Sequence, residues 1–413
     1  MRALLLLLLF PAFISGCTAA LPRERLFYPL ATPESSDQVK IVTIPLPVVA
    51  ASPNEGFTSG ALAAFLLHNS SNEVTSLIAP QINYNPNFGT TYTLYGAFYP
   101  HHLRSAEINL SRSTHINEDY EAKIKDLTLL DGNLETNLFG YHFSDGSARF
   151  FGLGADSSEN SETNFAAVES GFTYSGGYKL YQDISLKLGE RLRKVRIAPG
   201  AVDSVPSIKE NFSESDAPGI HGFTAHAQKI ELLFNTLDSP TMPLSGLYGR
   251  VSAEVSSKAL GSETDYFRYE VEAKGFVPHD KERRFITAFR GFYSQVTNSA
   301  TPFLEQSSIG GETSLRGYGR NRFIDSAALL FNLEERIRLF RWTLFDVNAD
   351  WEFAPFLDAG AVMSTLDRIN GHDFKFTPGF GIRAVVRPNI VGRMDIGFGS
   401  EGTAVFVGLG YPF

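Results

Sequence analysis

Apolar and polar residues alternate strictly in many segments of the chain. Between Phe267 and Gly275, every second side chain is apolar or small. The positions between them are all charged: Arg268, Glu270, Glu272 and Lys274. A period of two predicts a β-strand with one apolar face and one polar face. The same alternation recurs in three further segments, 184–189, 250–255 and 329–334. Such repetition is typical of a transmembrane β-barrel with lipid outside and a polar lumen inside.

Counting back from the C-terminus, the pattern predicts strands near 403–413, 391–399, 377–387, 351–363, 327–340, 284–295, 266–277, 247–257, 226–237, 183–195 and 164–175. Upstream candidates lie near 56–67, 75–84, 90–100, 105–114, 120–130 and 135–143. Single-chain outer-membrane barrels have an even number of strands. The total becomes sixteen if one candidate is not a membrane strand, and eighteen if 39–49 adds one. We predict an all-β fold, a transmembrane antiparallel β-barrel of sixteen strands, with eighteen as the alternative.

Strand parity also assigns the connections to the two sides of the membrane. With both ends of the barrel chain in the periplasm, short connections near 182, 240–246 and 278–281 fall on the periplasmic side. The longer connections near 144–163, 196–222 and 296–326 fall outside the cell. Short periplasmic turns and long external loops are the arrangement expected of such barrels.

The final segment ends on an aromatic residue. Four alternating positions are apolar and are expected to face the lipid: Val407, Leu409, Tyr411 and Phe413. This arrangement resembles the C-terminal strand that outer-membrane proteins present to their assembly machinery. The alternative is a core strand that happens to be last. Pro412 is unusual in a strand because it donates no hydrogen bond, but it lies at the very end.

The N-terminus predicts export. Arg2 precedes an apolar stretch, 3–14, which is too short to span a bilayer. The sequence Ile14-Ser15-Gly16-Cys17 follows and resembles a bacterial lipobox. We therefore expect a lipoprotein-type signal peptide over 1–16, lipidation of Cys17 and a proline-rich periplasmic linker over 17–50. The barrel domain is expected over 51–413. The alternative is an ordinary signal peptide cleaved near Ala20.

Composition narrows the functional classes. A net charge of −9 argues against a nucleic-acid partner, which would need a basic face. Cys17 is the only cysteine, which excludes an internal disulfide and a cysteine metal cluster. Neither Gly-x-Ser-x-Gly nor His-Glu-x-x-His occurs, and the histidines lack metal-ligand spacing. We therefore expect no catalytic residue, no metal and no cofactor.

One long loop and the two strands after it carry a distinctive set of residues. The loop contains Gly310, Gly311, Arg316, Gly317 and Tyr318, and the next strands contain Asn332-Leu333-Glu334 and Phe356-Leu357-Asp358-Ala359-Gly360. Strand parity directs Glu334, Asp358 and Gly360 inward. If the loop folds into the lumen, Arg316 can form a bidentate pair with Asp358 and also reach Glu334. Gly317 would allow close backbone approach, and Tyr318 would pack on the inner wall. The alternative is a solvated loop arginine unrelated to the strand acids.

This ordered set resembles the barrel of the BamA/TamA superfamily, the bacterial surface antigen family, which includes two-partner secretion translocators. The resemblance covers roughly residues 50–413 and is strongest over 303–413. It implies an outer-membrane protein that assembles, inserts or translocates other proteins without covalent chemistry. The barrel seam and the lumen loop would carry this activity. The implied partners are outer-membrane lipid, nascent outer-membrane or secreted proteins and a separate periplasmic protein.

The chain departs from the family in one respect. Members that assemble barrels carry periplasmic repeat domains before the barrel, but only about thirty residues separate Cys17 from the predicted strands. No such repeat fits there. An outer-membrane channel or a structural barrel that has lost assembly activity is therefore the alternative function.

Overall fold

The computed structural model describes residues 18–22, 38–69, 73–101, 103–344, 347–387 and 390–413. The predicted signal peptide and Cys17 lie outside the described residues. Within the described ranges, every helix is too short or too polar to span a bilayer.

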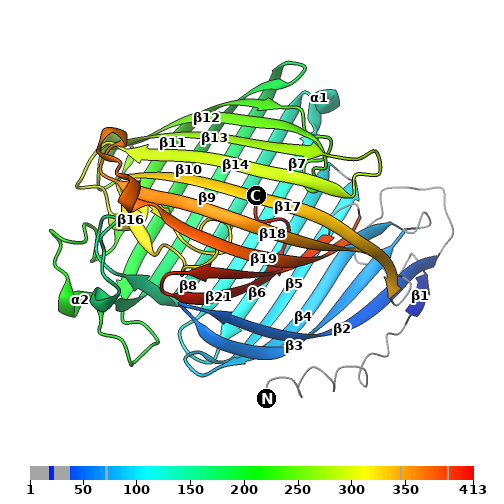
Figure 1. The fold of residues 1–413 in the computed structure, drawn as a ribbon, viewed down its shortest axis with the longest axis horizontal. Helices are drawn as coiled ribbons and strands as arrows, with labels where there is room; N and C mark the ends of the chain where they lie inside the picture. Colours follow the sequence, from blue (N-terminus) through cyan, green and yellow to red (C-terminus); the bar gives the residue numbers. More distant parts are fainter. Residues whose placement is uncertain (1–17, 23–37, 70–72, 102, 345–346, 388–389) are drawn as a thin grey trace.

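The described chain forms a closed antiparallel β-barrel in which each strand pairs with the next along the sequence (Figure 1). The sheet has nineteen strands in the described residues, and eighteen of them form the barrel because the short β1 (Thr18–Pro22) only flanks β2. The first barrel strands are β2 (Gln38–Ser52), β3 (Gly56–His68), β4 (Val74–Asn85), β5 (Gly89–His101), β6 (Arg104–Ser113), β7 (Glu118–Thr128), β8 (Leu134–Phe150), β9 (Thr163–Tyr181) and β10 (Ile184–Ala198). The others are β11 (Phe223–Asn235), β12 (Gly246–Ser256), β13 (Tyr266–Pro278), β14 (Phe285–Val296), β17 (Ala327–Leu344), β18 (Val347–Met363), β19 (Lys375–Val386), β20 (Ile390–Gly399) and β21 (Gly402–Leu409).

The expectation of an all-β antiparallel barrel is confirmed. The preferred count of sixteen strands is wrong, and the alternative count of eighteen is the observed one. The additional strand at the start of the barrel is β2, so the barrel begins at Gln38 and not at residue 51. The expected linker over 17–50 therefore ends well before its predicted boundary. The sequence predicts a linker here because the segment contains Pro45 and Pro47. The strand nevertheless accommodates both prolines, since β2 keeps an unbroken register with β3 from Lys40 to Ser52.

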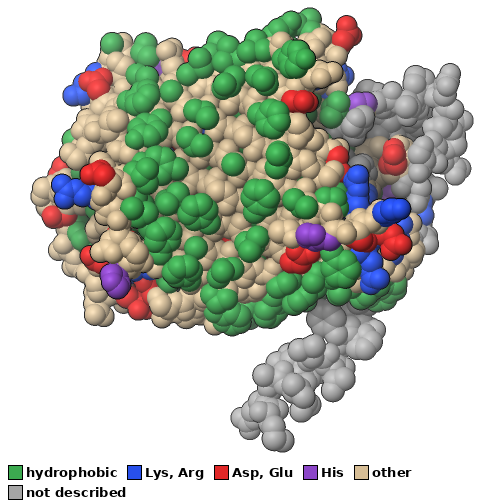
Figure 2. All heavy atoms as spheres, turned by 45° about the horizontal axis from the view of Figure 1, so that its top comes forward, with side chains coloured by type: hydrophobic (Ala, Val, Ile, Leu, Met, Phe, Trp, Pro, Cys, Tyr) green, Lys and Arg blue, Asp and Glu red, His purple; other side chains and the backbone are tan. Residues whose placement is uncertain are grey.

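Side chains alternate between the lipid and the lumen along the wall. Val271 on β13 is 45% exposed, whereas its neighbour Glu272 is only 7% exposed. Figure 2 shows apolar side chains spread over the barrel wall, with charged side chains gathered toward its margins. Outward apolar and inward charged positions are what a lipid-embedded barrel requires.

The last strand is shorter than expected. β21 ends at Leu409, and Gly410 has a φ of +82°, a left-handed backbone conformation that glycine adopts at little cost. The chain then turns into the lumen, where Tyr411 and Phe413 pack against interior side chains. The expected outward alternation therefore holds for Val407 and Leu409 but not for the two final aromatic residues.

The two ends of the barrel differ. One end, here called the long-loop end, carries the connections 151–162, 199–222, 297–326 and 364–374. The opposite end, the short-turn end, carries most of the short turns, the start of β2 and the C-terminal tail, residues 410–413. The loop 297–326, here called the lumen loop, contains η4 (Phe303–Glu305), β15 (Ser307–Ile309) and β16 (Phe323–Asp325). Its core residues Phe303, Ile309 and Leu315 are each at most 1% exposed. This loop therefore packs against the inner wall and not in solvent.

The lipid-facing assignment predicts an asymmetric effect of charge. Val271→Arg should lower the free energy of unfolding in a bilayer by about 2–4 kcal/mol, because a mid-strand arginine on this face must enter hydrocarbon. Leu260→Arg, in the exposed connection between β12 and β13, is the matched control and should have little effect. Denaturant titration of the folded gel band in liposomes measures both changes. Equal stability of the two variants would contradict the assignment.

Candidate functional site

The lumen loop presents its motif on a short hairpin. β15 and β16 pair through Ser307 to Ile309 and Phe323 to Asp325, and the tip between them contains residues 310–322. Gly310 and Gly311 have φ values of +118° and +103°, so the double glycine turns the chain where other residues would be strained. Leu315 and Tyr318 are buried with Ile309 and Phe323 against β17 and β18. The hairpin is thus fixed by apolar packing as well as by polar contacts.

Arg316 lies at the centre of a buried ion network. Its Nε and Nη2 atoms donate to the two carboxylate oxygens of Asp358, both at 2.9 Å. Its Nη1 donates to Glu334 at 2.7 Å, and its guanidinium lies over the ring of Phe356 at 3.4 Å. Burial would lower the pKa of Arg316, but Asp358 and then Glu334 outweigh it and raise the pKa above its ordinary value. The arginine is therefore charged and held at several points.

The glycines around Arg316 permit backbone contact between loop and wall. A Cβ on Gly317 would lie 2.6 Å from the backbone nitrogen of Gly399, and one on Gly397 would lie 2.1 Å from the carbonyl oxygen of Arg316. Tyr318 is buried, and its hydroxyl lies 3.0 Å from that of Ser400. Gly360 lies beneath the hairpin, where a Cβ would be 3.1 Å from Ile309. The structure thus brings together Arg316, Gly317, Tyr318, Glu334, Asp358 and Gly360.

The network extends to residues that the sequence analysis did not single out. Glu334 also binds Arg336 and Arg383, each at 3.1 Å. Asp395 binds Arg383 and Arg393, and Arg393 in turn binds Glu312 of the lumen loop. Arg336 is two positions after Glu334, and Arg383, Arg393 and Asp395 lie within the strands predicted over 377–387 and 391–399. Glu312 follows the double glycine of the loop. Strand alternation, applied to every charged residue of the predicted strands, would have shown that Arg336, Arg383, Arg393 and Asp395 point into the lumen.

The C-terminal tail is fastened to the same network. The guanidinium of Arg336 lies 3.6 Å from the ring centre of Tyr411, 5.1 Å from that of Phe276 and 6.0 Å from that of Phe413. The hydroxyl of Tyr411 donates to Glu352 at 2.9 Å. The turn 236–245 also folds inward, because its Met242 is buried with Tyr411, Val385 and Val391. Arg336 therefore joins the tail to Glu334 and, through it, to Arg316.

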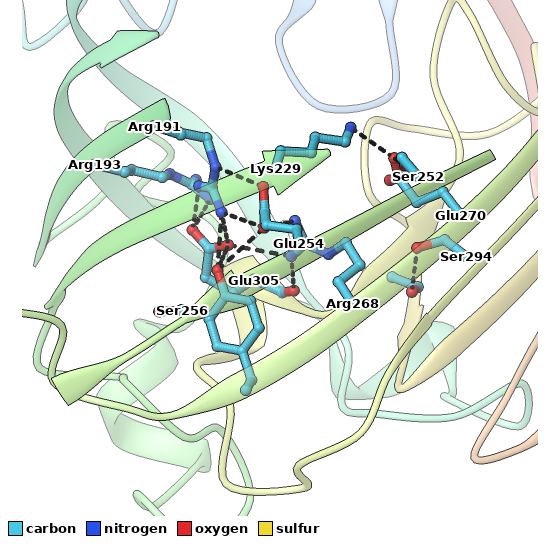
Figure 3. Close-up of polar contacts among 12 residues, drawn as sticks. Arg191, Arg193, Lys229, Ser252, Glu254, Ser256, Arg268, Glu270, Ser294 and Glu305 are labelled. Carbon is cyan, nitrogen blue, oxygen red and sulfur yellow. Dashed lines mark hydrogen bonds and ion pairs between the residues drawn. The ribbon is translucent and has the colours of Figure 1, made fainter. Parts of the chain in front are cut away.

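A second anchor holds the lumen loop to another part of the wall, at β10 and β13. Figure 3 shows Glu305 of the loop meeting Arg191 and Arg193 of β10 and Arg268 of β13. Both nitrogens Nη1 and Nη2 of Arg191 donate to the Glu305 carboxylate, at 2.9 and 2.8 Å. The hydroxyl of Tyr266 donates to it at 2.8 Å. Burial would raise the pKa of Glu305, but the three arginines outweigh it and hold the pKa well below its ordinary value. Glu305 is therefore an ionised tether, and the sequence analysis missed it because it lies outside any motif.

The barrel closes through a weak seam between β2 and β21. Among the described residues, the register that joins these strands consists of one pair, Ala51 with Val405. At the short-turn end, the same edge of β2 pairs with β1 through residues 38–42. Residues 43–50 have no registered partner on this edge in the described chain. All other neighbouring strands of the barrel pair over longer registers, so the seam is its weakest ladder.

Two prolines weaken the seam edge of β2 further. Pro45 and Pro47 lie two residues apart and therefore share one edge of the strand. Proline has no N–H to donate, yet the β2–β3 ladder passes both residues without a register shift. The N–H groups that the two prolines lack are therefore missing from the other edge of β2, which faces the seam. A partner strand on this edge would form fewer hydrogen bonds than in an ordinary ladder.

These features define a class of protein: an outer-membrane β-barrel whose lumen holds a loop carrying Arg-Gly-Tyr and whose first and last strands meet at a weak seam. The Omp85 superfamily domain matches residues 102–398. The chain therefore belongs to the Omp85 superfamily, which confirms the resemblance to BamA/TamA-type barrels.

Two solved structures share the fold at low sequence identity. BamA from Haemophilus ducreyi lacking POTRA domains 1–3 has a TM-score of 0.52 and 14% identity, and the match covers 89% of this chain and 74% of that chain. CdiB from Escherichia coli has a TM-score of 0.53 and 12% identity, with 89% of this chain and 66% of that chain covered. The chain thus spans just under two thirds of CdiB. At such identities the likeness concerns the fold alone.

The geometry around Arg316 predicts a large loss of stability on removing one carboxylate. Asp358→Asn should lower the free energy of unfolding by about 3–5 kcal/mol, because it leaves a buried arginine short of a counter-charge. Arg316→Lys should have a smaller effect, because lysine keeps the charge but not the planar two-point contact. The temperature at which the folded band disappears in heat-modifiability gels measures both. Asp367→Asn, on an exposed loop carboxylate, is the control and should melt like the wild type.

The second anchor predicts that the attachment of the lumen loop to β10 and β13 depends on the carboxylate of Glu305. Glu305→Gln leaves three arginines facing a neutral group and should lower the free energy of unfolding by about 3–5 kcal/mol. It should also make the lumen loop more accessible to trypsin. Glu263→Gln, on an exposed loop carboxylate, serves as the matched control. A protease pattern for Glu305→Gln identical to that of this control would show that Glu305 does not tether the loop.

Proposed function

We propose that this protein assembles or translocates other proteins at the outer membrane through its barrel seam, without covalent chemistry. The observation that carries the proposal is the seam itself. Among the residues that the structure describes, one registered pair joins β2 to β21, and residues 43–50 present a strand edge without a registered partner. An unpaired strand edge is a template for pairing with another chain. In this proposal, the long-loop end faces outward, and the short-turn end faces the periplasm.

The contents of the lumen support the same proposal. The lumen loop is anchored to β17, β18 and β20 through Arg316 and to β10 and β13 through Glu305, and the tail and the turn 236–245 occupy the short-turn end. A client strand would therefore reach the membrane sideways through the seam. The proposed partners are outer-membrane lipid, a nascent outer-membrane or secreted protein and a separate periplasmic protein that delivers it. Lipidation of Cys17 would hold the N-terminus at the periplasmic leaflet.

A channel is the second candidate, and the remaining cavities favour it. A cavity of about 450 Å³ lies at the short-turn end beside Tyr99, Lys125 and Phe413. Another of about 400 Å³ lies toward the long-loop end beside Asn83, Asp119 and Arg320. Both are lined in part by residues of β4–β7. A small solute could use this side of the lumen if the two cavities connected.

Depletion combined with a seam disulfide tests the proposal. Residues paired directly across an antiparallel ladder have the spacing that a disulfide requires. Loss of the protein should lower the amount of its clients in the outer membrane. An Ala51→Cys/Val405→Cys variant should restore them only under reducing conditions, because the oxidised bond would lock the seam.

The control is Val251→Cys/Val271→Cys, a pair on the lipid face of the ordinary β12–β13 ladder, which should restore the clients under both conditions. Full activity of the oxidised seam variant would contradict the proposal. A large steady conductance of the intact protein in planar bilayers, with unchanged outer-membrane proteins on depletion, would favour the channel.

A further inference from the structure

The two turns that flank the seam at the long-loop end are both in contact with the lumen loop. One is the β2–β3 turn, residues 53–55, and the other is the β20–β21 turn, residues 400–401. They belong to opposite ends of the barrel sequence and are brought together only by closure of the barrel. The one seam pair found in the described part of the chain, Ala51 with Val405, lies close to both turns in the sequence.

Asn54 binds the loop from the first side of the seam. Its Oδ1 accepts a hydrogen bond from the backbone nitrogen of Arg320 at 2.8 Å, and its Nδ2 donates to the carbonyl oxygen of the same residue at 3.5 Å. Asn54 is only 8% exposed, and Arg149 of β8 donates to its carbonyl oxygen at 3.0 Å. A Cβ on Gly319 would lie 2.1 Å from Asn54 Oδ1. The loop and this turn therefore fit closely and leave no room for a side chain at residue 319.

Ser400 and Glu401 bind the loop from the second side. The Tyr318 hydroxyl lies 3.0 Å from the Ser400 hydroxyl and accepts a hydrogen bond from the Ser400 backbone nitrogen at 3.2 Å. The Arg322 guanidinium pairs with Glu401 at 2.7 Å. It is buried between the rings of Phe151 and Phe323, 3.9 and 4.5 Å from their centres. Within the segment 318–322, Arg320 thus binds one side of the seam, and Tyr318 and Arg322 bind the other.

We propose that residues 318–322 form a latch that holds the seam closed at the long-loop end, with Asn54 and Glu401 as its two positioning residues. This inference rests on the proposed use of the seam. A ladder of one residue pair contributes little closure by itself, whereas the latch joins the same two strands through a segment that Arg316 and Glu305 anchor to the wall. The seam can part at this end only after the latch leaves one of the two turns.

The two arms of the latch differ in strength. The arm to Glu401 is charge-assisted and partly buried, and such pairs are roughly twice as strong as neutral hydrogen bonds. The arm to Asn54 consists of neutral hydrogen bonds to one backbone unit. The latch is therefore expected to release β2 first and to remain with β21. Asn54 sets how readily the seam opens.

Pulsed EPR distance measurements across the seam test the latch. Spin labels are placed at Phe57→Cys on β3 and Thr403→Cys on β21, two exposed positions near the long-loop end on opposite sides of the seam, in a Cys17→Ser background. The otherwise unaltered protein should give one narrow distance distribution. Asn54→Ala should raise the population at longer distances roughly two- to tenfold, the change expected from losing the net contribution of one hydrogen bond.

Matched variants separate the latch from general loosening. Asn298→Ala removes a similar side-chain bond, to the carbonyl oxygen of Asp265, in a loop contact away from the seam, and it should leave the distribution unchanged. Tyr318→Phe and Glu401→Gln weaken the other arm with little change of volume and should broaden the distribution. If Asn54→Ala does not fold, these two variants decide the question.

Distance distributions that match that of Asn298→Ala in all folded latch variants would overturn the proposal. The measurement uses no client protein, so its failure would not by itself contradict the proposed assembly activity.

Discussion

The burial of the Arg316 guanidinium is the constraint on which the rest of the lumen depends. A charged group that is almost inaccessible to water is stable only when carboxylates replace its hydration. Three of them come from different strands of one wall: Asp358 from β18, Glu334 from β17 and Asp395 from β20. A loop in solvent would need none of these inward charges. The inward carboxylates of the wall and the inward position of the loop therefore depend on each other.

The same requirement carries the network toward the opposite end of the barrel. Each buried carboxylate attracts further arginines, and Glu334 is shared by Arg316, Arg336 and Arg383. Arg336 then uses its remaining face to stack on the aromatic tail. A displacement of Arg316 would leave Glu334 with an altered balance of charges and would change the environment of Arg336. The lumen loop and the C-terminal tail are therefore coupled by shared ion pairs, although they lie in different halves of the lumen.

The alternation of residues was sufficient to predict the barrel, the inward direction of Asp358 and Glu334 and the order of long and short connections. It gave β2 only as an alternative, the strand over 39–49, because Pro45 and Pro47 argue against a strand unless its outer edge is known to lack a continuous partner. It could not predict the inward turn of Tyr411 and Phe413. That turn depends on the left-handed conformation of Gly410 and on Arg336, which is distant in the sequence. Glu305 was missed for the same reason, because its partners on β10 and β13 are close only in the folded barrel.

The two strands of the seam are not equivalent. β21 is paired along its length with β20, and its end is fixed by the tail in the lumen. β2 is paired along its length with β3, but two donors are missing from its free edge. A strand that pairs with this edge gains fewer backbone hydrogen bonds than it would in a complete ladder, so it is held less tightly and leaves more readily. The proposed assembly activity needs an edge that accepts a client strand without retaining it, and the prolines of β2 would give the edge this property.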